Sequence, residues 1–206
     1  MTSSLQTSDD ITQQEILQAA LGLYRKFGPD KVTMDDVAAA AGRSRSSLYY
    51  YYKNRDEVFQ AVLDTIVDEM AKAIRRAVAN ADTLNDKLYA FCFAKIKTSE
   101  DWKSILNKML SSMDDNDGKS RHAKMMGALH KKLLYQESII LTETLSAEMS
   151  QKQMRPINAM EQDMLSFLIS CSIRGIRNEI YNQQDPHDIK AAVRVLTDVV
   201  AKWLKD

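Results

Sequence analysis

Apolar residues recur at helical spacing through most of the chain. Near the N-terminus Ile16, Ala20, Leu23 and Phe27 follow one another at intervals of three or four residues, which places them on one helix face. From residue 58 onward a second stripe repeats with the same period. No segment alternates apolar and polar residues as a half-buried strand would. The pattern therefore predicts an all-α fold.

The first predicted helix has clear start and stop signals. Thr12 and Glu15 have the spacing of a capping box, with Ile11 and Ile16 at the flanking apolar positions, so we expect the helix to begin there. Gly28, followed by proline, is expected to end it.

Two shorter helices are predicted to follow. Thr33 and Asp36 form a second cap and box-like pair for a helix over 34–41, which Gly42 ends. Ser44 has the character of a third N-cap, for a helix running through 45–51. A short capped helix, a glycine turn and another short helix form the layout of a DNA-binding helix-turn-helix.

The rest of the chain is predicted to be helical as well. The expected helices span 54–80, 84–97, 101–113, 119–150, 156–183 and 188–205. The acidic segment between the third and fourth of these resembles a calcium loop. Met113 occupies its first ligand position, however, and Lys124 the last, where glutamate is required, so we exclude a calcium site.

Composition supports a helical protein with a substantial core. The chain has 206 residues, 45% of them hydrophobic, with only 3 prolines and 6 glycines. The first ten residues lack the features of a secretory signal, and no apolar run approaches the roughly 18 residues that span a bilayer. Cys92 and Cys171 follow no metal or redox spacing, and His122 and His130 lack a third ligand. We expect a cytoplasmic protein without metal or cofactor.

Net charge is zero, but the charge is unevenly distributed. One stretch without acidic residues contains Arg43, Arg45, Lys53 and Arg55. A DNA phosphate backbone would attract such a group of positive charges. Four cations alone are more often ordinary solvated surface. The four tyrosines at 49–52 strengthen the DNA interpretation, because consecutive helical residues point all round the helix and cannot all be buried. Leu48 and Tyr52 are the expected apolar anchors.

The stretch from Thr33 to Phe59 resembles the signature of the TetR repressor family, and the similarity covers roughly residues 10–62. A threonine-capped helix ends in Ala-Gly, a serine-capped helix carries Leu-Tyr-Tyr, and a Lys-Asn-Arg tail follows. The resemblance implies phosphate contacts from Thr33, Ser44, Tyr49, Lys53 and Arg55. It implies base-edge or mixed contacts from Arg45, Ser46, Ser47, Tyr50 and Tyr51.

Four positions depart from the family pattern. Arg43 replaces an apolar residue, and it either adds a phosphate contact or lies along the surface. Ser46 stands where glycine is common, Tyr51 where histidine is common, and Arg55 where lysine is usual. These departures do not affect the expected fold, but they leave the operator sequence open.

The resemblance also implies two domains: an N-terminal helix-turn-helix domain over 9–55 and a helical ligand-binding and dimerisation domain over 56–206. In the family the last two helices form the dimer interface. Here they carry apolar stripes at Met160, Met164, Phe167, Leu168, Cys171 and Gly175, and at Ile189, Val193, Leu196, Val200 and Trp203. The alternative is that these stripes only complete the core of a single chain.

The middle of the chain is rich in methionine and aromatic residues, which suits a pocket for apolar ligands. The candidate pocket residues are Phe91, Phe93, Trp102, Met109, Met126 and Phe167. Gap-filling in helical packing explains any one of the methionines equally well. No catalytic motif is present, so we do not expect an enzyme.

The sequence is thus interpreted as a homodimeric repressor that a small apolar or amphipathic molecule releases from double-stranded operator DNA. Two alternatives remain. One is a regulator of the same fold that a protein partner controls, and the other is a helical enzyme or structural bundle whose similarity is accidental.

Overall fold

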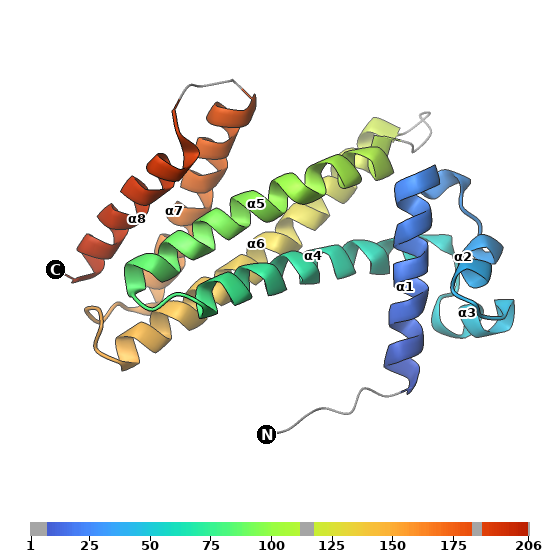
Figure 1. Cartoon of the computed structure of the whole chain (residues 1–206), viewed down its shortest axis with the longest axis horizontal. Helices are drawn as coiled ribbons and strands as arrows, with labels where there is room; N and C mark the ends of the chain where they lie inside the picture. Colours follow the sequence, from blue (N-terminus) through green and yellow to red (C-terminus); the bar gives the residue numbers. More distant parts are fainter. Residues whose placement is uncertain (1–7, 112–117, 183–186, 206) are drawn as a thin grey trace. The chain divides into compact units, whose positions relative to one another are not determined.

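The computed structural model describes residues 8–111, 118–182 and 187–205, and all of their regular structure is helical, as predicted (Figure 1). The elements are α1 (Ser8–Phe27), a 3-10 turn η1 (Pro29–Lys31), α2 (Met34–Ala40), α3 (Arg45–Tyr51), α4 (Arg55–Ala79), α5 (Leu84–Ser111), α6 (Gly118–Ser150), α7 (Ala159–Arg177), a π-helical turn η2 (Asn178–Asn182) and α8 (Ile189–Lys205). None of the helices within these ranges is both long enough and apolar enough to cross a membrane.

The chain divides into two compact units. The N-terminal unit comprises the residues up to Asp68 together with Trp102–Leu129, and the C-terminal unit comprises Glu69–Asp101 together with the residues from His130 onward. Helices α4, α5 and α6 therefore each contribute residues to both units. The N-terminal unit contains all of the segment 9–55 that was expected to bind DNA, and it extends beyond it.

In the N-terminal unit, α1 packs against α2, and α2 packs against α3. Ile16 and Tyr24 from α1 and Leu48 from α3 are completely buried. The Tyr24 ring meets Phe59 of α4 edge-on, with the ring centroids 5.4 Å apart. Burial raises the pKa of Tyr24 to about 12, so its hydroxyl stays protonated at physiological pH. These contacts hold the helix-turn-helix on α1.

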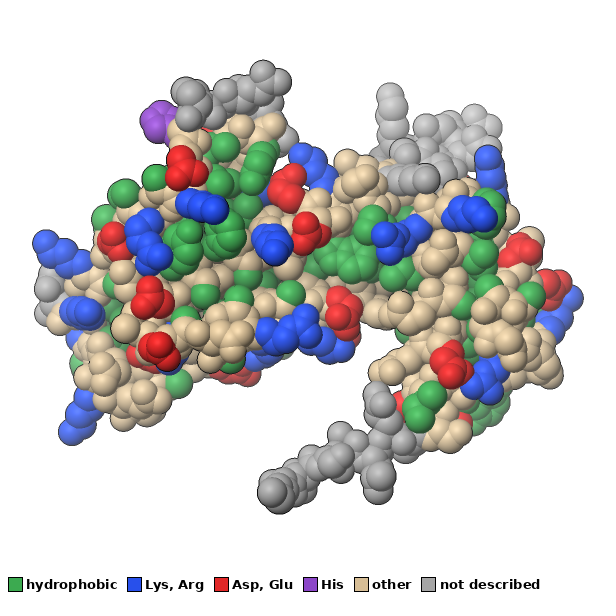
Figure 2. All heavy atoms as spheres, viewed as in Figure 1, with side chains coloured by type: hydrophobic (Ala, Val, Ile, Leu, Met, Phe, Trp, Pro, Cys, Tyr) green, Lys and Arg blue, Asp and Glu red, His purple; other side chains and the backbone are tan. Residues whose placement is uncertain are grey.

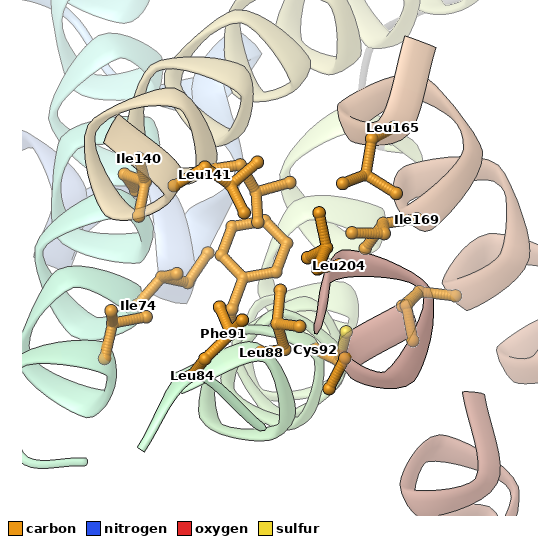
Figure 3. Close-up of a cluster of buried hydrophobic side chains, with 14 of the residues drawn as sticks. Ile74, Leu84, Leu88, Phe91, Cys92, Ile140, Leu141, Leu165, Ile169 and Leu204 are labelled. Atoms are coloured by element: carbon orange, nitrogen blue, oxygen red, sulfur yellow. The ribbon is translucent and has the colours of Figure 1, made fainter. Parts of the chain in front are cut away.

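The C-terminal unit has a continuous apolar core built from all five of its helices. Figure 3 shows the Phe91 ring of α5 among side chains of the neighbouring helices, and Phe91 is 1% exposed. The core includes Ile74 from α4, Leu141 from α6, Ile169 from α7 and Leu204 from α8. Burial of so many large apolar side chains is the main source of this unit's stability.

The predicted start of the first helix is wrong. Helix α1 begins at Ser8, and Thr12 lies inside it, where its Oγ1 donates a hydrogen bond to the Ser8 carbonyl oxygen at 3.0 Å. A threonine hydroxyl can bond the carbonyl four residues earlier without ending a helix. The carboxylates of Asp9 and Asp10 also suit the positive end of the helix dipole.

The predicted break after residue 97 is also wrong, because α5 continues to Ser111. Thr98 falls in the gap expected between two helices, but its Oγ1 donates to the Ala94 carbonyl oxygen at 2.9 Å within one continuous helix. Helix α7 starts at Ala159 rather than at 156. Asn158 and Glu161 form its capping box, which was not among the predicted caps.

Candidate DNA-binding surface

The start of α2 is fixed by the predicted capping box. Thr33 Oγ1 accepts a hydrogen bond from the Asp36 backbone N–H at 3.2 Å, while Asp36 Oδ2 accepts from the Thr33 backbone N–H at 2.8 Å. The Thr33 hydroxyl donates to the same carboxylate at 2.7 Å, and these bonds lower the pKa of Asp36. Thr33 is exposed at this helix end.

A tight turn joins α2 to α3. Gly42 has a φ of 64°, in the left-handed region that glycine adopts without strain. The turn is closed by a bond from the Arg43 N–H to the Ala38 carbonyl oxygen at 2.9 Å. Ser44 then caps α3 as predicted, with its Oγ accepting from the Ser47 N–H at 3.1 Å. Local chemistry therefore sets where α3 begins.

The two faces of α3 differ sharply. Leu48 is completely buried and Tyr52, just after the helix, is 7% exposed, so both are apolar anchors as predicted. On the outer side, Tyr50 is 78% exposed and Tyr49 is 40% exposed. The Tyr50 ring meets that of Tyr51 edge-on at 5.0 Å. The tyrosines thus divide between core and surface, and α3 presents phenols to the exterior.

The other candidate DNA-binding residues lie along the same short segment, from the cap of α2 to the start of α4. Exposed side chains are those of Thr33, Arg43, Ser44, Arg45, Ser46, Tyr49, Tyr50 and Lys53, and half-buried ones are those of Ser47, Tyr51 and Arg55. All eleven belong to the N-terminal unit. That these eleven side chains contact DNA stays a prediction.

The arginines of this surface have acidic partners that no local sequence pattern indicated. Three arginines form ion pairs with carboxylates from outside the stretch 43–55: Arg43 with Glu15, Arg45 with Asp35 at 3.2 Å, and Arg55 with Asp30 at 3.7 Å. Tyr51 likewise donates a hydrogen bond from its hydroxyl to Asp9 Oδ1 at 2.9 Å, which raises the pKa of Tyr51. The surface is therefore less basic than the stretch alone suggested.

The candidate pocket residues do not share one unit. Phe91 lies in the core of the C-terminal unit, whereas Phe93 is half-buried and stacks on Tyr89, with ring centroids 5.9 Å apart. Trp102 and Met109 belong to the N-terminal unit. The side chain of Met126 lies outside the described residues. Phe167 is 61% exposed on α7, so it lies on the surface of this chain rather than in its core.

Two ion pairs inside the C-terminal unit were not anticipated. Lys95 of α5 donates to Glu137 of α6 at 2.6 Å, and Lys87 donates to Glu148 at the same distance. Both glutamates are buried, and burial raises the pKa of Glu137. A signal was present in the sequence, because Lys95 lies four residues after Phe91 on the apolar stripe of its helix.

Helices α7 and α8 carry a broad apolar surface, and Figure 2 shows hydrophobic side chains gathered over both. The exposed residues are Met160, Met164, Phe167 and Leu168 on α7, and Val195, Val199 and Trp203 on α8. The predicted stripe on α8 is partly wrong. Val193 is completely buried, and Ile189, Leu196 and Val200 pack against the core of the same chain.

Neither cysteine belongs to a recognisable metal or redox site. Cys92 is buried in the core of the C-terminal unit, and burial raises its thiol pKa to about 12. Across the described ranges, no three His, Cys, Asp or Glu side chains are grouped so that they could hold a metal ion.

Known proteins match the chain in two ways. The family model described as "Bacterial regulatory proteins, tetR family" matches residues 16–62. The HTH-type transcriptional regulator YfiR of Bacillus subtilis, itself uncharacterized, is 37% identical over 60 residues, which are 29% of each chain. The chain spans only 29%, 41% and 35% of the length of three curated relatives that it matches.

Solved structures extend the likeness of fold to almost the whole chain. The TetR family repressor AlkX from Dietzia sp., implicated in biodegradation of n-alkanes, has a TM-score of 0.56 at 21% identity, covering 93% of this chain and 95% of its own. A SmeT–triclosan complex has a TM-score of 0.52 at 16% identity, covering 92% and 91%. The helix-turn-helix region of this chain therefore matches the TetR family of bacterial regulatory proteins, and the solved structures show that the likeness of fold covers almost the whole chain.

Proposed function

We propose that this protein is a transcriptional regulator that binds operator DNA through α3 and releases it when a small molecule binds the C-terminal unit. The observation that carries the proposal is the two-faced character of α3. Leu48 is buried, while Tyr50 is 78% exposed among hydroxyl and guanidinium groups. A short helix anchored in this way can enter the major groove.

The exposed groups divide by their chemistry. Arg45, Ser46 and Tyr50 extend from α3 itself, and their donors and acceptors suit base edges in the groove. Thr33, Ser44 and Lys53 lie at helix ends or beyond them, where they suit phosphate oxygens. In this proposal the first group supplies sequence choice and the second supplies most of the salt-dependent affinity.

We further propose that a second copy of the chain covers the exposed apolar surface of α7 and α8. Val195 and Val199 are 64% and 63% exposed, and α7 carries Met160 at 78%. Large exposed apolar patches commonly mark protein interfaces. A two-fold dimer would present two reading helices to a palindromic operator, with half-sites roughly 34–36 Å apart.

Regulation follows if the effector binds one arrangement of the helices better than another. Helices α4, α5 and α6 each contribute residues to both units, so a change in their packing in one unit acts on the same helices in the other. By reciprocity, an effector that weakens DNA binding must itself bind more weakly to the DNA complex. The SmeT structure, a complex with triclosan, agrees with a small-molecule effector of the apolar or amphipathic class proposed here.

The test is selection of bound fragments from genomic DNA, followed by titration of the enriched sequence and a scrambled duplex. Tyr50→Ala is expected to lose about five- to 150-fold of its preference for the enriched sequence, because a base-edge contact is worth roughly 1–3 kcal/mol. Lys53→Ala should weaken both duplexes alike. The matched control is Tyr135→Ala, which removes a tyrosine that is 67% exposed on α6. Failure to enrich any sequence would contradict the proposal.

A further inference from the structure

Helices α5 and α6 are joined inside the C-terminal unit by two ion pairs of the same length. Lys95 Nζ lies 2.6 Å from Glu137 Oε2, and Lys87 Nζ lies 2.6 Å from Glu148 Oε1. The side chains of Glu137 and Glu148 are 1% and 2% exposed. Each carboxylate is thus removed from water and neutralised by one lysine, as buried charges generally require.

The two pairs differ in the second oxygen of the glutamate. Glu137 Oε1 is buried and accepts no hydrogen bond from any residue that the structure describes. A buried acceptor without a donor costs on the order of 1–3 kcal/mol, and buried polar atoms in native proteins nearly always have a partner. Neither oxygen of Glu148 is buried without a hydrogen-bond partner in the part of the chain that the structure describes. The Lys95–Glu137 pair therefore retains one strong, unused acceptor.

The surroundings of this acceptor are amphipathic. Phe91 and Leu141 lie one helical turn away, on α5 and α6, and both are in the apolar core. On the polar side, Arg177 of α7 interacts electrostatically with Glu137 and lies 3.9 Å from Glu100 Oε1. His130 lies 3.2 Å from Arg174 and interacts electrostatically with Lys95 and Arg177. The acceptor thus lies between an apolar core and a set of charged side chains.

We infer that Glu137 Oε1 is the anchor for the polar head of the effector, and that this head is a hydrogen-bond donor, either a hydroxyl or a protonated amine. The apolar body of the effector would pack against the core residues around Phe91. An anionic head is disfavoured at this anchor, because the charge of Lys95 is already neutralised by the other oxygen of Glu137. The inference rests on the proposed regulation by a small molecule, and it names the ligand's chemistry.

Three probes with the same alkyl chain test this assignment: decylamine and decanoate, each titrated below its micelle concentration, and decan-1-ol, titrated below its solubility limit. Binding is measured by calorimetry and by the shift in melting temperature. The amine and the alcohol are expected to bind the wild-type chain at least about tenfold more tightly than decanoate, since hydrogen bonds to charged groups are strong when desolvated. Lys95→Met combined with Glu137→Leu should abolish that preference.

The second ion pair provides the matched control. Lys87→Met combined with Glu148→Leu removes an equally short pair between the same helices, and it should keep the order of the three probes. If the first double variant does not fold by circular dichroism, Glu137→Gln alone should still lose about tenfold in affinity for decylamine.

Three results would overturn the inference: decanoate binding as tightly as the amine, both double variants losing the preference equally, or no probe binding the wild-type chain. DNA titrations on the same preparations separate this failure from failure of the proposed function. A wild-type chain that binds its selected DNA but does not rank the probes as expected would refute only the role of Glu137.

Discussion

Arg45 Nη1 lies 3.2 Å from Asp35 Oδ2, so an arginine proposed to read base edges is paired with a carboxylate of α2 in the free chain. The Arg45 guanidinium also lies over the Tyr49 ring, 5.5 Å from its centroid. Both members of the ion pair are well exposed, so the pair contributes little to folding stability. In the proposed DNA complex the pair would matter more, because a phosphate backbone repels a nearby carboxylate.

Asp35→Asn is therefore expected to raise affinity for scrambled DNA several-fold while raising affinity for the selected operator less. If α3 reads the operator as proposed, Asp35 would oppose every approach to phosphate, and in the specific complex its bond to Arg45 would also orient that guanidinium toward a base. Fluorescence anisotropy with both duplexes at two salt concentrations measures the ratio of the affinity for the operator to the affinity for scrambled DNA. Glu15→Gln, which frees Arg43 at the turn, is the control and should raise both affinities alike. An unchanged ratio for Asp35→Asn would refute its role in specificity.

The exposed and buried faces of α8 predict opposite effects for two similar substitutions. Val199→Asp places a charge on the surface proposed to meet a second copy, where an unpaired charge costs roughly several kcal/mol. It should convert the dimer to a folded monomer with the same melting temperature at low concentration. Leu196→Asp, directed at the core of the same chain, should lower the melting temperature itself. Sedimentation and thermal denaturation separate the two, and a wild-type monomer at micromolar concentration would refute the dimer.

The capping box of α2 predicts a pH-dependent contribution to stability. The bonds from Thr33 lower the pKa of Asp36 below its ordinary value of 3.8, so the stabilisation is fully present above that value and is lost as pH falls through the lower folded pKa. Thr33→Ala should cost about 1 kcal/mol near neutral pH. The difference in unfolding free energy between Thr33→Ala and the wild type should narrow as the pH falls below 3.8, the ordinary pKa of this carboxyl group.

Urea denaturation followed by helical circular dichroism, at about pH 7 and about pH 3, measures this difference. Thr65→Ala is the matched control, because the Thr65 hydroxyl donates to the Ala61 carbonyl oxygen within α4 and involves no carboxylate. A Thr33→Ala deficit that does not change with pH would show that the Asp36 bond contributes nothing.

The helix-turn-helix was predictable from sequence because its geometry is set by local chemistry. The caps at Thr33 and Ser44 and the left-handed Gly42 each depend on residues within a few positions, and all three are confirmed. Thr12 misled for the opposite reason, since a threonine hydroxyl inside a helix has the same sequence signature as one at its end.

Ion pairs between residues far apart in the chain could not be predicted from the sequence. The partners of Arg43 and Arg55 are 28 and 25 residues away, and no local pattern joins them. The stripe on α8 was partly mistaken because a helix with one broad apolar face does not show which part of that face meets its own core. The Lys95–Glu137 pair was detectable only as a lysine placed among apolar positions.

The two ion pairs between α5 and α6 also fix the register of these helices. Lys87 and Lys95 hold their partners at two points separated by about 12 Å along α5, at 1.5 Å per residue. Sliding one helix past the other by a turn would leave two buried carboxylates and two lysines without their partners at once. This would cost far more free energy than tilting both helices together. Helices α5 and α6 of this unit therefore behave as a single rigid strut, and a conformational change must occur where that strut meets its other neighbours.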